Sequence, residues 1–165
     1  MKKLLLGLIA LILFTFVGCA VKVIGDEKTS EDFVKSQGYN IIARKGEILK
    51  YTFEINKLNG EIEPLPYQQM WALQKVEPDK YFGKEITIYC FTVKNHPLEK
   101  TYKVKTNVYI MISDGKVIGG YSFPVADSDV AMNGSLYSLD GKTLEEVTGL
   151  SYQNWRENWK KKYGN

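Results

Sequence analysis

The segment 104–123 constrains the fold most strongly, because its pattern predicts two paired strands. Over residues 104–112 the even positions are apolar or threonine, whereas Lys105 and Asn107 occupy odd positions. Such alternation is typical of a strand with one buried face. Asp114-Gly115 follows, a dipeptide that suits a two-residue hairpin turn, and residues 116–123 return as the second strand. The chain is therefore expected to contain an antiparallel sheet.

The turn also predicts how the two strands face each other. A two-residue loop sets the register of both strands, and in that register their buried faces agree. The expected pairs are Ile112 with Val117, Ile110 with Gly119, and Val108 with Tyr121. Gly119-Gly120 leaves space for close packing of a neighbour or for a bulge.

More strands are predicted before this hairpin. Residues 39–44 and 47–55 flank Lys45-Gly46, which we interpret as a second hairpin turn. Residues 85–93 are β-branched and aromatic on both faces, which is typical of an interior strand. Residues 135–138 are expected to form a short strand.

Short helices are expected between the strands. One covers residues 31–37, with the hydroxyls of Thr29-Ser30 as its N-cap and Gly38 at its end. Another covers residues 67–75 and stops before Pro78.

The C-terminal part contains two capped helices. Thr143 and Glu146 have the spacing of a capping box, and Gly149 is placed to end the turn of helix that it starts. The last helix is expected from Ser151, its N-cap, to Tyr163, and one face of it carries aromatic residues at steps of three and four. Together these patterns predict a single α+β domain: a mostly antiparallel sheet with short helices on one face and a C-terminal aromatic helix.

The N-terminus has the form of an export signal. Lys2 and Lys3 precede an uncharged apolar run over residues 4–17, which ends at Gly18-Cys19. The pattern resembles bacterial lipoprotein signals, although Phe16 stands where leucine is usual. The resemblance implies cleavage before Cys19 and attachment of a diacylglyceryl group to it, and two acyl chains hold a protein stably at a membrane.

Two other interpretations of this segment remain open. Residues 4–21 are marginally long enough for an uncleaved signal anchor, and a freely secreted form is the third possibility. The lipid-anchored form and the uncleaved signal anchor both place the domain outside the cell membrane, because Lys2 and Lys3 stay on the cytoplasmic side. We expect a signal peptide over 1–18, a tether over 19–29 and a globular domain over 30–165.

Charge and cysteine content restrict the partners further. Without Lys2 and Lys3 the chain keeps 20 basic side chains against 19 acidic ones, a net charge of +1. This balance disfavours nucleic acid as a partner. Once Cys19 is lipidated, Cys90 is the only cysteine left, so an internal disulfide is not expected.

Several motifs resemble an uncharacterised domain of small lipoproteins from spore-forming Gram-positive bacteria. They are the stretches 33–39, 81–84, 95–97, 108–111 and, most distinctive, Gly-Lys-Val-Ile-Gly-Gly at 115–120. The similarity covers most of residues 30–134, and the tail from Leu136 departs from it. The resemblance supports the exported lipoprotein and implies no catalytic residue.

The chemistry-bearing residues form no strong catalytic or metal motif. Cys90 and His96 would lie roughly 20 Å apart in an extended strand, too far for a thiol and its base. Asp127-Ser128-Asp129, with Asp114, offers oxygen ligands to calcium but lacks the spacing and the closing glutamate of calcium loops. We therefore expect no cofactor, no metal site and no catalytic residue.

The C-terminal helix is the one candidate contact surface. Its aromatic face and neighbouring lysines are typical either of core packing, which we favour, or of contact with a membrane or partner. The candidate contact residues are Tyr152, Trp155, Trp159, Lys160, Lys161 and Lys162. Tyr109 and Tyr121 are a weaker candidate, as an exposed platform for a sugar or peptide.

These observations lead to one functional prediction with two alternatives. We expect a lipid-anchored protein on the extracellular face of the cell membrane, acting as a non-catalytic binding module for a peptide, a protein partner or a cell-wall polymer. The alternatives are an envelope hydrolase and a structural accessory subunit of a membrane complex.

Overall fold

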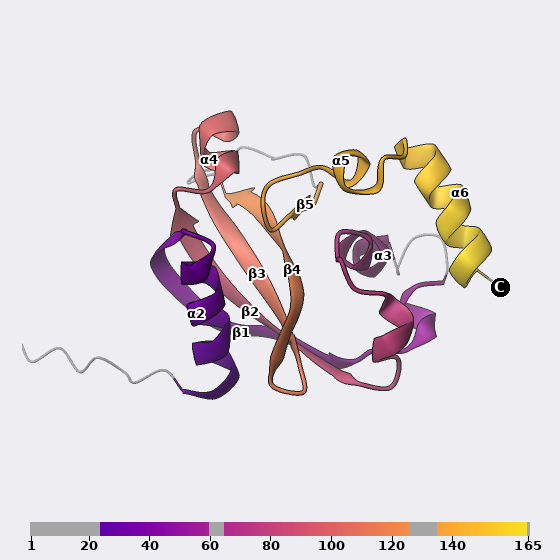
Figure 1. The fold of residues 1–165 in the computed structure, drawn as a ribbon, viewed down its shortest axis with the longest axis horizontal. Coiled ribbons are helices and arrows are strands. Elements are labelled where there is room, and N and C mark those ends of the chain that lie inside the picture. The colour runs from indigo at the N-terminus through magenta and orange to yellow at the C-terminus, as the bar shows by residue number, and fades with distance from the viewer. Residues whose placement is uncertain (1–23, 60–64, 126–134, 165) are drawn as a thin grey trace, which may run out of the picture.

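A computed structural model describes residues 24–59, 65–125 and 135–164, and the expected signal segment lies outside these ranges. The described chain forms one α+β domain around a five-stranded antiparallel sheet (Figure 1). The strands follow one another across the sheet in chain order: β1 (Asn40–Thr52), β2 (Glu85–Lys94), β3 (Lys105–Ser113), β4 (Lys116–Val125) and β5 (Tyr137–Ser138). The predicted fold class is confirmed.

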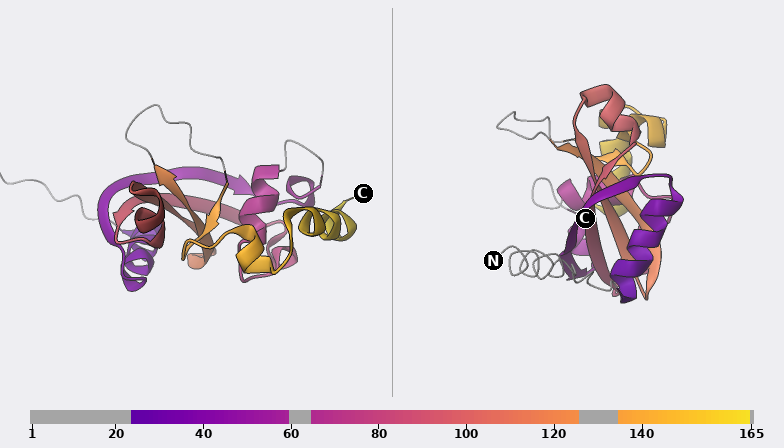
Figure 2. Two further views of the ribbon diagram at one scale, coloured as in Figure 1. Left: turned by 90° about the horizontal axis from the view of Figure 1, so that it is seen from above. Right: turned by 90° about the vertical axis from the view of Figure 1, so that its left-hand side faces the viewer.

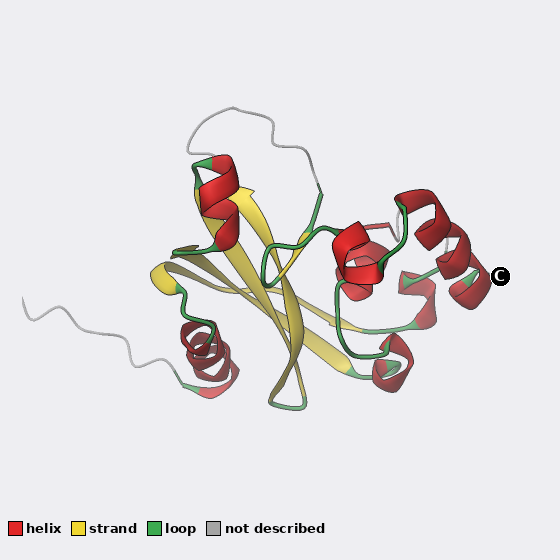
Figure 3. Cartoon of the chain, turned by 45° about the horizontal axis from the view of Figure 1, so that its top comes forward, coloured by secondary structure: helices red, strands yellow, loops and turns green. Residues whose placement is uncertain are grey.

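Short helices surround the sheet (Figure 3). They are α2 (Gly25–Ser36), α3 (Leu65–Ala72), α4 (Pro97–Tyr102), α5 (Leu144–Thr148) and α6 (Tyr152–Tyr163), with the 3-10 turns η1 (Ile55–Lys57) and η2 (Pro78–Tyr81). Helices α2 and α6 lie at opposite ends of the longest axis of the molecule (Figures 1 and 2). Within the described ranges, every helix is too short or too polar to cross a bilayer.

The core consists of two clusters of buried apolar side chains on opposite faces of the sheet. Successive residues of a strand point to opposite faces, so β3 contributes to both clusters. Met111 packs in the cluster that contains Trp71 of α3, and Ile110 packs in the cluster that contains Val34 of α2. The strand expected to have one buried face is therefore buried on both, and helices contact both faces of the sheet rather than one.

The segment expected to form a hairpin at Lys45-Gly46 is one continuous edge strand, so that prediction was wrong. Because β1 contains three bulges, its 13 residues pair with the 10 residues of β2. Gly46 adopts a positive φ of 71° beside one of them. A glycine in this conformation serves a bulge as well as a turn, so the dipeptide alone does not distinguish the two.

The hairpin between β3 and β4 forms as predicted at its turn and differs beyond it. Asp114 and Gly115 both have positive φ, and Ile112 pairs with Val117. A register shift after this pair places Ile110 opposite Gly120, one residue beyond the expected partner. The expected pairing of Val108 with Tyr121 is displaced in the same way, to Ser122.

Gly119-Gly120 allows Gln74, two residues after the end of α3, to reach this hairpin. The side-chain oxygen Oε1 of Gln74 accepts a hydrogen bond from the backbone N–H of Gly120 at 2.7 Å. A Cβ atom at Gly119 would lie 2.0 Å from the same oxygen. The glycine pair thus permits the close packing that its sequence indicated, and the register shift lies beside it, where Ile118 has no partner in β3.

Helix α2 begins at Gly25, six residues before the expected start. The hydroxyls of Thr29 and Ser30 do not cap it, because they donate to the carbonyls of Gly25 and Asp26 inside the helix. Acidic residues in the first turn favour this earlier start through the helix dipole. Residues 25–29 of the expected tether therefore belong to the helix, and Gly38, with a φ of 82°, follows its end as predicted.

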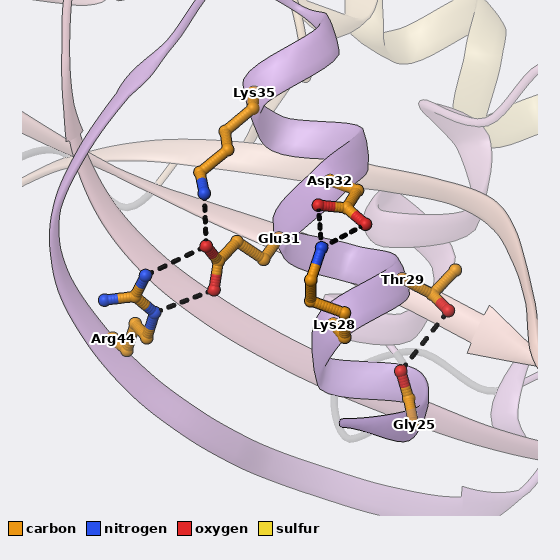
Figure 4. Close-up of polar contacts among 7 residues, drawn as sticks. All are labelled: Gly25, Lys28, Thr29, Glu31, Asp32, Lys35 and Arg44. Carbon is orange, nitrogen blue, oxygen red and sulfur yellow. Dashed lines mark hydrogen bonds and ion pairs between the residues drawn. The ribbon is translucent and has the colours of Figure 1, made fainter. Parts of the chain in front are cut away.

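A buried carboxylate fixes α2 against β1 (Figure 4). Arg44 of β1 donates to both carboxylate oxygens of Glu31, at 2.8 and 2.9 Å, and Lys35 donates to one of them. The hydrogen bonds from Arg44 and then Lys35 hold the pKa of Glu31 at about 2. This contact joins the first helix to the edge strand.

Candidate functional site

The sequence candidates for catalysis are held in structural roles. Cys90 lies in the middle of β2, and burial raises the pKa of its thiol. His96 is the N-cap of α4: its Nδ1 accepts a hydrogen bond from the N–H of Leu98 at 3.2 Å, and its Nε2 lies 2.9 Å from the carbonyl oxygen of Leu139. An accepting Nδ1 assigns the proton to Nε2, which donates to Leu139. Backbone groups therefore occupy both ring nitrogens of His96.

The metal candidates are only partly within the described ranges. Asp127, Ser128 and Asp129 lie outside them, whereas Asp114 forms an ion pair with Lys84 at 2.9 Å. Among the residues that the structure describes, no three histidine, cysteine, aspartate or glutamate side chains gather in a metal-binding group.

The aromatic face of α6 packs on the domain. Trp155 and Tyr163 are buried, and Trp159 lies between them with its ring centroid 5.6 Å from Trp155 and 4.7 Å from Tyr163. Trp159 also donates from Nε1 to the carbonyl of Leu58 at 3.1 Å. Core packing of this face, predicted from its spacing, is confirmed.

The remaining contact candidates of α6 differ in their environments. Tyr152 is 41% exposed, and Lys161 is exposed as well. Lys162 forms an ion pair with Glu77 at 2.7 Å, and Lys160 also has an interaction partner. Contact of this helix with a membrane or protein partner stays a prediction.

Tyr109 and Tyr121 do not form the open platform considered above. Their rings stack with centroids 4.6 Å apart and an interplanar angle of 7°. Both rings are half-buried and pack against the core, and this burial raises the pKa of both phenols.

A pocket of about 310 Å³ lies where α3, β5, α5 and the start of α6 meet. Helix α3 contributes Gln69 and the buried Leu73. Ser135, Leu136 and Tyr137 form a second wall as the chain enters β5. The volume is at the lower end of the range for small-ligand sites, so the pocket accommodates one or two side chains or a single sugar ring.

Helix α5 and the first residue of α6 complete the pocket. Thr143, Leu144 and Glu145 line it together with Tyr152. The capping box fixes this wall, because the Thr143 hydroxyl accepts from the N–H of Glu146 at 3.2 Å and Glu146 accepts from the N–H of Thr143 at 2.7 Å. Oε1 of Glu145 accepts a hydrogen bond from the N–H of Tyr152 at 3.2 Å, which links α5 to α6.

Hydrogen bonds hold the β5 wall of the pocket to residues outside the pocket, namely Tyr39, His96 and Tyr102. The carbonyl of Leu139 accepts from the Tyr39 hydroxyl at 2.8 Å as well as from His96. Tyr137 shares a hydrogen bond with the hydroxyl of Tyr102, and burial, followed by this neighbour, raises the pKa of Tyr137 to about 12. The aromatic wall is thus neutral and held in position at ordinary pH.

Some polar groups of the pocket keep free hydrogen-bonding capacity. Within the described ranges, the amide of Gln69 and the hydroxyl of Ser135 have no hydrogen-bond partner, and Glu145 uses only Oε1. Glu145 is also the only charged side chain among the described residues that line the pocket. The pocket therefore combines leucine and tyrosine surfaces with a few unengaged polar groups, as ligand sites commonly do.

Sequence reasoning identified Tyr152 as a contact candidate and missed the rest of the pocket. The lining residues come from four elements between Gln69 and Tyr152, and they follow no shared motif. The capping box was the one local sequence signal for a pocket residue, because it places Glu145 in the exposed first turn of α5.

Comparison of the chain with protein-family models, with curated proteins and with solved structures gives no match. The resemblance to an uncharacterised lipoprotein domain therefore stays a prediction, and the site is interpreted from its own geometry.

Proposed function

We propose that this chain is an exported, lipid-anchored envelope protein whose domain is a non-catalytic binding module. The pocket between α3, β5, α5 and α6 carries this proposal, because it offers apolar walls and unengaged polar groups on a scaffold fixed by hydrogen bonds. The export and anchoring part rests on the N-terminal pattern that ends at Gly18-Cys19.

The short chain between the anchor and α2 supports an orientation in which the pocket lies away from the membrane. Five residues of chain from Cys19 to Ile24 reach at most roughly 17 Å, so a lipid on Cys19 keeps the start of α2 near the bilayer. The three helices that line the pocket, α3, α5 and α6, lie toward the other end of the long axis (Figure 1). An anchored domain can therefore present the pocket to the space outside the membrane.

A retention experiment tests the binding function. The full chain in phosphatidylcholine nanodiscs is mixed with a washed bacterial envelope fraction, and the bound share is measured after sedimentation. Gln69→Trp fills the pocket, whereas Gln153→Trp places the same side chain on an exposed position of α6 outside the lining. We expect Gln69→Trp alone to abolish retention, with unchanged thermal midpoints for both variants.

Other outcomes contradict the proposal. Equal retention of Gln69→Trp and the unmodified chain would remove the pocket from the function, and lack of retention of the unmodified chain would contradict envelope binding. Mass spectrometry of the N-terminal peptide tests the anchor separately: we expect it to begin at a lipid-modified Cys19. An intact Met1 and an unmodified thiol would instead support the signal anchor.

A further inference from the structure

The pocket has a charge character that restricts its ligand. Among the described lining residues, Glu145 is the only charged one, and none of them is lysine, arginine or histidine. A phosphate or carboxylate group would enter beside a carboxylate without a compensating cation, which disfavours anionic ligands. A positively charged group would meet the opposite charge.

The aromatic lining favours the same kind of group. Tyr137 and Tyr152 line the pocket together with Glu145. Aromatic faces attract cations, and a carboxylate forms charge-assisted hydrogen bonds with an ammonium group. Oε1 of Glu145 is engaged by the N–H of Tyr152, which fixes the carboxylate while Oε2 stays available for a donor.

The remaining surfaces fit an aliphatic body with a peptide backbone. Leu73, Leu136 and Leu144 form the apolar part of the lining. The amide of Gln69 offers both a donor and an acceptor, which matches a peptide group, and it has no partner in the described part of the chain. The volume of about 310 Å³ admits only one or two residues of such a chain.

We propose that this pocket binds a short peptide segment through a primary amine and an aliphatic side chain, with Glu145 as the amine acceptor and the leucines as the apolar surface. This inference rests on the proposed binding function and specifies its ligand. A lysine side chain or a free peptide N-terminus provides the required chemistry.

Titration calorimetry with three probes tests this inference on the full chain in phosphatidylcholine nanodiscs. The probes are leucyl-lysine amide, its neutral analogue N-acetyl-leucyl-norleucine amide, and N-acetylglucosamine. Glu145→Gln keeps an oxygen that can accept the N–H of Tyr152 but removes the charge, and Glu54→Gln is the control at an exposed position outside the pocket. We expect leucyl-lysine amide to bind most tightly, with an affinity about fivefold lower in Glu145→Gln and unchanged in Glu54→Gln.

The neutral analogue and the sugar provide the opposing outcomes. Equal binding of the charged and neutral dipeptides, or no effect of Glu145→Gln, would overturn the amine assignment. If only N-acetylglucosamine binds and Gln69→Trp abolishes this binding, the pocket remains the binding site, but its ligand is a sugar and not a peptide amine. If none of the probes binds while Gln69→Trp still abolishes envelope retention, the peptide inference fails and the proposed function stands; if retention is also insensitive to Gln69→Trp, both fail.

Discussion

Two tryptophans of α6 respond differently to the same substitution, and this difference tests how the helix packs. Trp155 is only 3% exposed, and its buried Nε1 has no hydrogen-bond partner among the described residues. Trp159 is less buried, but its Nε1 donates to the carbonyl of Leu58. Replacement by phenylalanine removes an unpaired donor in the first case and a hydrogen bond in the second.

The expected magnitudes follow from these environments. Trp155→Phe loses packing of about 1–2 kcal/mol but removes an unpaired N–H that costs about 1–3 kcal/mol, so its net effect stays close to zero. Trp159→Phe leaves the Leu58 carbonyl without this donor and destabilises the domain by about 1–3 kcal/mol. Trp155→Ala creates a cavity and costs about 3–5 kcal/mol, which lowers the thermal midpoint by about 10 °C for a chain of this size.

Near-ultraviolet circular dichroism of the full chain in nanodiscs measures the three midpoints during heating. We expect the order Trp155→Phe, Trp159→Phe and Trp155→Ala, from smallest to largest loss. An unchanged midpoint for Trp155→Ala, together with weaker binding to liposomes, would refute core packing and assign α6 to the membrane surface.

Three further substitutions test contacts elsewhere in the domain. Gly120→Ala should destabilise the chain by at least about 2 kcal/mol in thermal unfolding, because the alanine Cβ would lie 2.2 Å from the backbone carbonyl oxygen of Tyr109. An unchanged thermal midpoint would contradict the close approach of β3 and β4. Burial lowers the pKa of His96 below its ordinary value of about 6.5, so the stability that neutral His96 contributes is complete above pH 6.5 and is lost as the pH falls below it. His96→Asn can still cap α4 and should flatten this pH dependence of the thermal midpoint. An unaltered pH dependence in the variant would contradict the role of His96. Glu31→Gln should destabilise the domain by about 1 kcal/mol, because its partner Arg44 is half exposed. In acid unfolding, the variant should lack the loss of stability that begins below pH 4.5 and continues toward pH 2 in the unmodified chain. An acid transition identical to that of the unmodified chain would refute the role of the carboxylate.

Local signals predicted the parts of the fold that are determined locally. The turn at Asp114-Gly115 and the caps at Thr143 and Ser151 formed as expected, because each depends on residues within one turn of chain. Lys45-Gly46 was misinterpreted because the pairing of β1 with β2, in which Gly46 lies opposite the distant Cys90, decides between a bulge and a turn.

The candidate site depended on tertiary structure to a greater extent. Gln69 and Glu145 occupy ordinary helix positions, and only the packing of α3 beside α5 brings them to one pocket. The early start of α2 had a signal that was overlooked, since Asp26 and Glu27 are acidic residues suited to a first turn.

Methyl NMR of leucine-labelled chain tests the central claim, that this pocket is the binding site, most directly. Leu73, Leu136 and Leu144 line the pocket, whereas Leu58 and Leu98 are buried elsewhere and serve as controls. On titration with soluble fragments released from the washed envelope fraction, we predict shifts of the three pocket leucines that saturate together and disappear in Gln69→Trp. Saturating shifts at Leu58 or Leu98 with the pocket leucines unmoved would contradict the account.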